Sequence, residues 1–219
     1  MTNIDNQIHS LLDPKNCVLV LIDFQPQMAF AVKSIDGQTL INNAEGLAKA
    51  AKIFNVPTIL TSVAEKSFSG PYFTQIKKVF PGQEVIDRTT MNSWEDKRVV
   101  DAIKKTGRKK IVFAGLWTEV CIVTPTIMAL EEGYEIYVVV DACGGTSQVA
   151  HDMAMLRMIQ AGAVPVTWLQ FLLELQRDWA RTETYDAVTT LAREDAGSYG
   201  LGLEYAKAML GEHAREGSK

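Results

Sequence analysis

Two side chains in this sequence have types and positions that suit nucleophilic chemistry. The first is Cys121, which stands in "AGLWTEVCIVTPTIMALEEGY" (114–134), between an apolar run and a helical pattern. A thiol at a helix N-terminus lies beside unpaired N–H groups and the positive end of the helix dipole, which lower its pKa. The same N–H groups would stabilise an oxyanion on a carbonyl under attack. Free cysteine is also among the most buried residue types, so Cys121 alone fits core packing equally well.

The second candidate is Asp23, which follows the apolar run "CVLVLI" in the segment "LIDFQ". A carboxylate there is costly unless it is paired or solvated. Near a thiol, it would accept the thiol proton as a general base and later return it to a leaving amine. An isolated aspartate at this place would be a capping or turn residue. Asp141 in "DACGGTS" fits that structural role better, and we expect Cys143 beside it to be structural as well.

The elements that must position these residues alternate along the chain. Short apolar runs predict buried strands, and periodic apolar residues predict helices. Between residues 64 and 95 the pattern is irregular and predicts long loops around a short helix near 73–79. A fifth predicted strand begins at 164 and turns helical by 175, and the other expected strands are 17–22, 56–63, 109–116 and 134–142. The expected helices are 43–54, 95–107 (capped by Ser93 or Asn92), the segment from Cys121 through Glu132, and 147–163.

This alternation predicts one α/β domain, a three-layer sandwich whose mostly parallel central sheet is flanked by helices. The domain spans 1–219, with a core at about 14–180 and a helical tail at about 181–219. The amphipathic tail segment "LGLEYAKAMLG" would pack on a neighbouring molecule or fold back on its own domain. Ligands of parallel sheets bind beyond the carboxyl ends of the strands. Asp23 and Cys121 both follow predicted strands, so we expect them at the same end of the sheet.

Composition excludes several classes of function. The 219 residues include 22 Lys and Arg against 26 Asp and Glu, and no basic cluster contains interleaved aromatics, so we expect no nucleic-acid partner. The longest apolar stretches are strand-sized, which argues against a membrane span, and the N-terminus does not resemble a signal peptide. Three cysteines without a CxxC pair indicate a reducing compartment. We therefore expect a cytoplasmic protein.

The strand ending "VLIDFQ", the turn and helix "GLWTEVCIVTPTIMALEEGYEIYVVVDA" and their spacing resemble the isochorismatase-like cysteine hydrolase superfamily. The resemblance is greatest to its YcaC-like branch and covers roughly residues 14 to 180. It implies a catalytic triad of Asp23, Arg88 in "VIDRTTMNSWED" and Cys121. It also implies a non-proline cis peptide, here between Trp117 and Thr118, which would turn the backbone amides of Thr118 and Cys121 towards the oxyanion.

Two departures from the family pattern bear on the chemistry. Most catalytically characterised members have lysine where Arg88 stands, and arginine holds a carboxylate but does not shuttle protons. Two alternatives for this position are that Lys66 reaches the site, and that Arg88 forms a surface ion pair with Asp87 or Glu84. The segment "TSVAEKSFSG" also lacks the histidines with which nicotinamidases bind metal. His9, His151 and His213 have no ligand spacing, so we expect no metal, no cofactor and a substrate other than nicotinamide.

The favoured function is a cysteine hydrolase that cleaves an amide-like C–N bond of a small molecule through a thioester at Cys121. The aromatic residues Phe24, Trp94 and Trp117 near the strand ends suggest a partly apolar pocket, and they fit core or subunit-interface packing equally well. The candidate substrate-binding residues are Phe24, Gln25 and Trp94. Vinyl-ether hydrolysis, as in isochorismatase itself, needs no thiol, so Cys121 argues against it. A non-catalytic or redox-sensing protein that keeps the fold is the alternative. The family implies a homo-oligomer, for which "WLQFLLELQRDW" is a candidate contact. The sequence does not specify the substrate, the oligomer size or the pathway.

Overall fold

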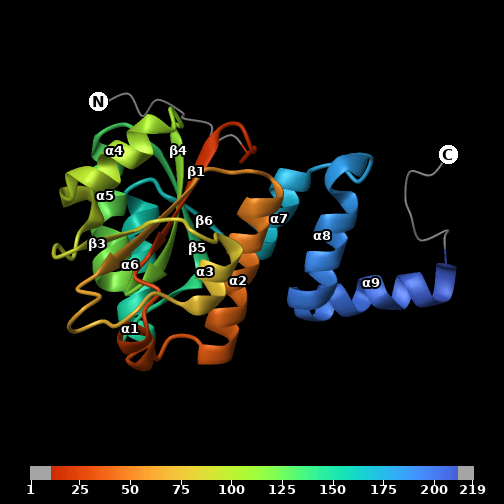
Figure 1. The fold of residues 1–219 in the computed structure, drawn as a ribbon, viewed down its shortest axis with the longest axis horizontal. Coiled ribbons are helices and arrows are strands. Elements are labelled where there is room, and N and C mark those ends of the chain that lie inside the picture. The colour runs from red at the N-terminus through yellow and green to blue at the C-terminus, as the bar shows by residue number, and fades with distance from the viewer. Residues whose placement is uncertain (1–10, 212–219) are drawn as a thin grey trace.

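A six-stranded, fully parallel sheet organises the computed structural model, which describes residues 11–211 (Figure 1). The strand order is β3-β2-β1-β4-β5-β6. The strands are β1 (Cys17–Ile22), β2 (Thr58–Val63), β3 (Val85–Arg88), β4 (Lys110–Leu116), β5 (Glu135–Gly144) and β6 (Val164–Val166). The predicted parallel sheet is therefore confirmed.

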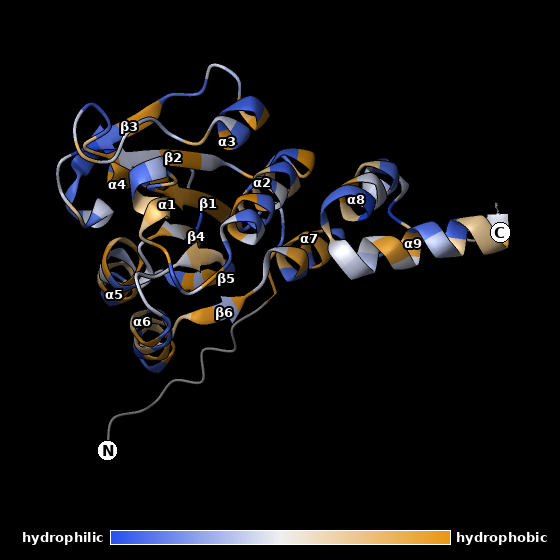
Figure 2. Ribbon diagram, turned by 90° about the horizontal axis from the view of Figure 1, so that it is seen from below, coloured by the Kyte–Doolittle hydropathy of each residue, from blue (hydrophilic) through white to orange (hydrophobic). Residues whose placement is uncertain are grey.

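Helices cover both faces of the sheet and complete the three layers. Figure 2 shows α4, α5 and α6 on one face and α2 and α7 on the other. The helices of the α/β part are α1 (Pro26–Phe30), α2 (Gly37–Ile53), α3 (Thr74–Val79), α4 (Lys97–Lys105), α5 (Val123–Glu131), α6 (Gln148–Gln160) and α7 (Trp168–Gln176). The predicted flanking helices are confirmed as well.

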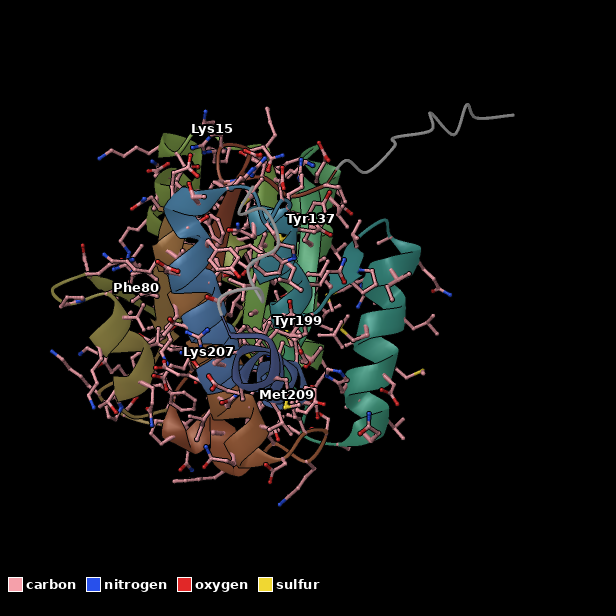
Figure 3. The ribbon with its side chains drawn as sticks, turned by 90° about the vertical axis from the view of Figure 1, so that its right-hand side faces the viewer. Lys15, Phe80, Tyr137, Tyr199, Lys207 and Met209 are labelled. Atoms are coloured by element: carbon pink, nitrogen blue, oxygen red, sulfur yellow. The ribbon has the colours of Figure 1, made fainter. Side chains whose placement is uncertain are left out.

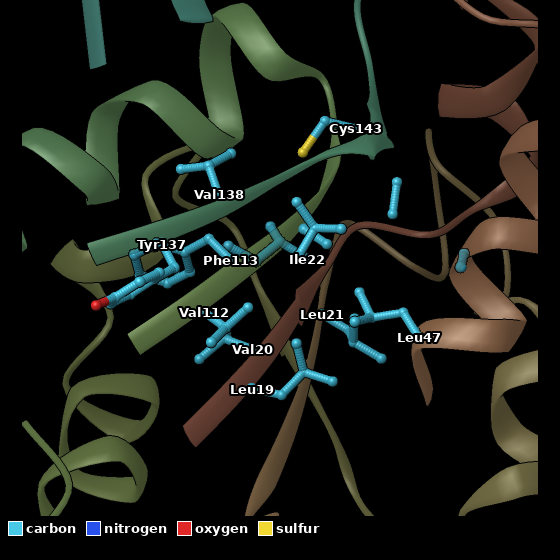
Figure 4. Packing of buried hydrophobic residues seen from close by; sticks show 14 of the residues in the cluster. Leu19, Val20, Leu21, Ile22, Leu47, Val112, Phe113, Tyr137, Val138 and Cys143 are labelled. Atoms are coloured by element: carbon cyan, nitrogen blue, oxygen red, sulfur yellow. The ribbon is translucent and has the colours of Figure 1, made fainter. Parts of the chain in front are cut away.

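The central strands form because they are buried on both faces. Every residue of β1 is buried, as the unbroken apolar run requires in a parallel sheet. Figure 4 shows Leu47 of α2 packed towards Leu21 of β1, while Val112 and Phe113 of β4 lie alongside the same strand. This core fixes the level at which β1 and β4 end, because Ile22 pairs with Gly115.

One strand was not predicted. β3 lies within the stretch 64–95, where the sequence predicted long loops around the short helix that is now α3. β3 has only four residues, of which three are half-buried, because it is the edge strand next to β2. A short edge strand has few buried apolar residues, so its sequence does not show the apolar run of a central strand. Here two of the four residues, Asp87 and Arg88, are charged.

Helix starts also differ from the prediction because side-chain caps decide them. α2 begins at Gly37, where the Asp36 side chain accepts from the Thr39 N–H, several residues before the predicted start at 43. Asp96 caps α4. Asn92 instead caps a short 3-10 helix at Ser93–Glu95. Such caps satisfy orphan N–H groups and need no apolar periodicity.

The C-terminal part forms two helices, α8 (Thr182–Asp195) and α9 (Gly197–Leu210), and α9 extends away from the sheet (Figure 1). Figure 3 looks nearly along α9, whose C-terminal end, with Met209, faces the viewer. α8 packs on its own domain through buried Val188, Leu191 and Ala192, whereas Leu201, Tyr205 and Met209 of α9 are 71%, 67% and 64% exposed. Within residues 11–211, no helix is long and apolar enough to cross a membrane.

The strand order places a topological switch between β1 and β4. The chain moves from β1 through β2 to β3 on one side, and from β4 through β5 to β6 on the other. Crevices at such a switch, beyond the carboxyl ends of the strands, are where parallel sheets bind ligands. Asp23 follows β1 and Cys121 follows β4, so both lie at this switch.

Candidate active site

Asp23 occupies an unusual backbone position directly after β1. Its φ of 55° is in the left-handed region, which aspartate tolerates better than most residues. The backbone is held by hydrogen bonds from the Asp23 N–H to the Thr61 carbonyl and from the Gln25 N–H to the Asp23 carbonyl. The side chain is fully buried. This carboxylate is therefore fixed inside the protein rather than solvated at a turn.

Arg88 provides the charge that balances Asp23. It ends β3, which lies two strands from β1, so its long side chain spans the end of β2, roughly 10 Å at the usual strand spacing. Its Nη2 donates to Asp23 Oδ2 at 2.7 Å, and both side chains are 0% exposed. Nη1 donates to the Thr90 carbonyl. The alternative of a surface ion pair with Asp87 or Glu84 is wrong, because Arg88 is buried against Asp23.

Cys121 lies in a tight turn between β4 and α5. Residues Thr118–Ile122 form a single π-helical turn, in which the Trp117 carbonyl accepts from the N–H groups of Val120, Cys121 and Ile122. Cys121 is only 2% exposed. Turns of this kind recur at functional sites, because they set a side chain apart from the regular helix.

The cis peptide lies one bond earlier than the family resemblance implied. It joins Leu116 to Trp117, and the predicted cis bond between Trp117 and Thr118 is wrong. Leu116 is still paired with Gly144 in the sheet, while Trp117 has extended backbone and caps the turn. The junction between strand and turn is therefore at Leu116–Trp117, and Thr118 already belongs to the turn.

Burial dominates the electrostatics of Asp23. It raises the pKa of the carboxyl to about 6, while the Arg88 charge and hydrogen bonds from the Cys121 thiol and Arg88 act in the opposite direction. Among the described residues, the second oxygen, Oδ1, is buried without a well-formed hydrogen bond. The Cys121 thiol therefore lowers the pKa of Asp23 by its proximity, although its geometry towards Oδ1 is not that of a well-formed hydrogen bond. Near neutral pH, Asp23 is mostly ionised and available to take a proton.

The thiol of Cys121 behaves differently from the expectation for a helix N-terminus. Burial, followed by the negative charge of Asp23 and a hydrogen bond to it, raises the pKa of Cys121 to about 12, although Arg88 acts in the opposite direction. The expected lowered pKa is therefore wrong for the resting site. The Cys121 N–H is also used, since it donates to the Trp117 carbonyl at 2.9 Å. The resting pair is a carboxylate and a neutral thiol.

Three consecutive side chains fasten this turn to its surroundings. Trp117 Nε1 donates to the Met28 carbonyl of α1 at 2.8 Å. Thr118 Oγ1 lies 2.8 Å from His151 Nδ1 of α6. Glu119 Oε1 accepts from the N–H and hydroxyl of Thr146, at 2.9 and 2.6 Å. Sequence reasoning missed these contacts, and it treated His151 only as a failed metal ligand.

The matches to known proteins agree with this geometry. The isochorismatase domain family model matches residues 17–170. The chain belongs to this family. The Escherichia coli (strain K12) protein "Probable hydrolase YcaC" is 38% identical over 169 residues, covering 77% of this chain and 81% of that protein. A solved structure of Escherichia coli YcaC has a TM-score of 0.87 at 35% identity and covers 92% of this chain and 98% of that one. Pseudomonas aeruginosa YcaC has a TM-score of 0.86 at 33% identity, covering 90% and 97%.

Two further candidates of this isochorismatase-family chain lie next to Asp23. Phe24 is buried and packs its ring against Tyr72 and Phe73. The Gln25 amide donates to the carbonyls of Val63 and Gly70 and accepts from the Val63 N–H. These contacts hold the loop after β2, so they favour a positioning role for Gln25 over a role in binding substrate.

Trp94 is not brought to the same place. Its indole N–H donates to Glu132 at 2.8 Å, and its ring packs against Tyr134, which directly precedes β5. Glu132 caps the far end of α5 from Cys121. Because Tyr134 marks the amino end of the sheet, Trp94 lies away from the triad. Its predicted role in substrate binding finds no support in this placement.

The alternative in which Lys66 reaches the site finds no support in its placement. Lys66 is exposed, and none of the contacts described for the Asp23 carboxylate involves it. Residues 11–211 contain no group of three or more His, Cys, Asp or Glu side chains that could hold a metal ion. His151 is buried beside Thr118, while His9 and His213 lie outside the described residues.

Proposed function

We propose that this isochorismatase-family protein is a cysteine hydrolase that cleaves an amide-like C–N bond of a small molecule. The observation that carries the proposal is the buried Asp23 carboxylate, which binds the Arg88 guanidinium and has the Cys121 thiol near enough to lower its pKa. A base, a nucleophile and a fixed cation at one sheet switch point are the parts that acyl transfer requires.

The first half-reaction joins substrate to enzyme. As the Cys121 sulfur attacks the carbonyl carbon, its proton passes to Asp23, and a tetrahedral oxyanion forms. Collapse of this intermediate breaks the C–N bond, and Asp23 returns the proton to the leaving amine, which leaves a thioester at Cys121. Because the thiol pKa is about 12, proton transfer accompanies the attack rather than preceding it.

The second half-reaction frees the enzyme by hydrolysis. Water loses a proton to Asp23 as its oxygen attacks the thioester, and the thiolate that leaves recovers that proton. An amide gives a carboxylic acid and an amine, and a carbamate gives carbon dioxide, an alcohol and an amine. A base with a pKa of about 6 suits both directions of proton transfer near neutral pH.

The oxyanion needs hydrogen-bond donors already in place. We assign the backbone N–H of Thr118 to this role, because Thr118 opens the turn and is held by His151. The Cys121 N–H is the second candidate, although it would have to share its proton with the Trp117 carbonyl.

Arg88 acts by charge and position in this proposal. Its two terminal nitrogens donate to Asp23 and to the Thr90 carbonyl, which holds the carboxylate in place. The guanidinium also opposes the rise in the Asp23 pKa that burial causes. Arginine stays protonated in proteins, so Asp23 alone moves protons.

The relatives support the hypothesis that the protein is a hydrolase, and they do not favour a non-catalytic or redox-sensing protein. Escherichia coli YcaC is described as an octameric hydrolase of unknown specificity, and Pseudomonas aeruginosa YcaC was solved with covalent acrylamide. Acrylamide is an electrophile that thiols attack, so a covalent adduct in a relative agrees with the reactive thiol proposed here. We propose a homo-oligomer here too. The three cysteines are free, which agrees with the cytoplasmic location that we propose.

Intact-mass trapping tests the proposal directly. The protein is incubated with a panel of small amides and carbamates and quenched in acid, and the adduct is located by peptide mass spectrometry. We expect an acyl adduct on Cys121 with at least one class, and none with Cys121→Ala. Cys17 and Cys143 serve as internal references, since burial raises the pKa of each to about 12 as well. An acyl adduct on Cys121 with no member of the panel, or equal labelling of all three cysteines, would contradict the proposal.

A further inference from the structure

His151 is a buried titratable side chain for which the proposed chemistry has no use. It stands in the first turn of α6 and is only 7% exposed. Its Nδ1 lies 2.8 Å from the hydroxyl oxygen of Thr118, which is itself fully buried. A buried polar contact between two segments this far apart in sequence costs free energy if either partner is lost. The contact therefore constrains the turn that carries Cys121.

The segment before α6 is built to bring His151 to this turn. Gly145 lies so close that a Cβ there would meet His151 Cβ and Glu119 Oε2, each at 2.9 Å. The next residue, Thr146, donates to Glu119, and Ser147 caps α6 by accepting from the Ala150 N–H. The start of α6 is thus fixed against the turn at two successive turn residues, Thr118 and Glu119.

The charge state of His151 agrees with a role in holding rather than in proton transfer. Burial lowers the pKa of His151, while the negative charges of Asp152 and Glu119 act in the opposite direction. A neutral imidazole at neutral pH bonds the Thr118 hydroxyl without placing a positive charge against the turn that carries Cys121.

We propose that His151 is a positioning residue, which holds Thr118 and so fixes the turn that presents Cys121 and the Thr118 N–H to the substrate. This inference rests on the proposed function. Thr118 is three residues before Cys121, and both belong to one π-helical turn, so a shift of Thr118 displaces the nucleophile and the oxyanion donor together. Reacting groups misplaced by about 1 Å can lose roughly 100-fold in rate.

The rate at which iodoacetamide alkylates Cys121 tests this role in the full-length protein, with Cys17 and Cys143 in each sample as references. We expect His151→Leu and Thr118→Val each to slow Cys121 by about 10- to 100-fold. The double variant should be no slower than either single one, because both remove the same contact. His151→Asn places an amide where Nδ1 stood and should keep the rate within about threefold. Arg157→Gln, on the exposed side of α6, is the control and should leave the rate unchanged.

The outcomes separate this inference from the proposed function. If Cys121 of the wild-type protein reacts no faster than Cys17 and Cys143, both are overturned. If Cys121 is fast and His151→Leu leaves it fast, only the role of His151 is overturned. An Asn variant as slow as the Leu variant, with wild-type melting behaviour, overturns it too. If His151→Leu does not fold, Thr118→Val and His151→Asn decide, and a wild-type rate in Thr118→Val overturns the role.

Discussion

At the scale of single residues, this site is governed by burial rather than by the helix dipole. Asp23, Arg88 and Cys121 are all nearly inaccessible to solvent. Removal from water raises the pKa of both the acid and the thiol, since it disfavours their charged forms. The Arg88 charge lowers both, but by less. The result is a carboxyl group with a pKa of about 6 near a thiol that is protonated at neutral pH. This is the resting state expected of a general base and its nucleophile.

The first prediction concerns the pH dependence of Cys121. The base form of Asp23 must take the thiol proton, so the alkylation rate should fall as the pH drops through about 6 and level off above it. Asp23→Asn should abolish this inflection and slow Cys121 at pH 7.5 by roughly 100-fold. The substitution also removes one cause of the raised thiol pKa, but burial, the largest cause, remains. Rates measured by mass spectrometry between pH 4.5 and 8 check this, and an unchanged profile in the variant would count against it.

The second prediction concerns the ion pair. Arg88→Met leaves Asp23 buried without its cation, which should cost about 3–5 kcal/mol of unfolding free energy at pH 7.5. The loss should shrink at pH 5, because a raised carboxyl pKa penalises only the ionised form, which is less populated there. Arg88→Lys keeps a positive charge, so its free energy of unfolding should lie between those of wild type and Arg88→Met. Urea unfolding at both pH values measures this, and equal stability of wild type and Arg88→Met would be inconsistent with it.

At the scale of elements, close packing of β1 on β4 decides where the site can form. Gly115 has a φ of 150°, and a Cβ at this position would lie 1.9 Å from the Ile22 carbonyl oxygen. Only glycine therefore lets the end of β4 lie against the end of β1, one residue before Asp23. The regular pairing of β4 with β5 is also interrupted at this place, between Phe113 and Gly115.

The third prediction follows from this close approach. Gly115→Ala should destabilise the fold by more than about 4 kcal/mol, because backbone rather than a flexible side chain blocks the new methyl group. Gly202→Ala is a matched control in α9, where no atom lies within 4 Å of the added Cβ. There the helix should gain about 0.5–1 kcal/mol. Thermal melts of the two variants distinguish them, and similar melting temperatures would refute the close-packing argument.

At the scale of the whole molecule, the exposed apolar residues of the C-terminal part lie on α9 rather than on α7. The stretch "WLQFLLELQRDW" was predicted to be a subunit contact, yet Trp168, Phe171, Leu172 and Leu175 are buried within the chain itself. Exposed apolar residues lie instead on α9, spaced four apart at Leu201, Tyr205 and Met209. α9 is tied to α8 by the Arg193–Glu204 ion pair at 2.9 Å. The two predictions for the tail concern residues 201–211, which lie almost entirely in α9. Because the apolar residues of this segment are exposed, the structure does not support the prediction that it folds back on its own domain.

The fourth prediction concerns assembly. If the protein is a homo-oligomer, light scattering should give a multiple of the 24.2 kDa chain mass. Replacing Leu201, Tyr205 and Met209 of α9 by Glu should lower that mass, because exposed apolar stripes are typical of protein contacts. Lys207→Ala on the same helix is the control and should not change it. A wild-type protein that runs as a monomer at micromolar concentration would contradict the prediction.

The sequence by itself determined the parts that rest on local pattern. The apolar runs predicted all strands of the sheet except β3. The ends of two of these strands placed Asp23 and Cys121 at the same end of the sheet. The family motif added Arg88, which composition and periodicity would not have found. The extent of the domain remains a prediction.

Tertiary structure decided what depends on solvent exclusion and on contacts between distant segments. Burial raised the pKa of Cys121, where the sequence predicted a lowered one. The edge strand β3 carried Arg88 to Asp23, and α6 brought His151 to Thr118. Trp94 went to the other end of α5. None of these can be read from residue types and spacing, because desolvation and long-range contacts exist only once the chain is folded.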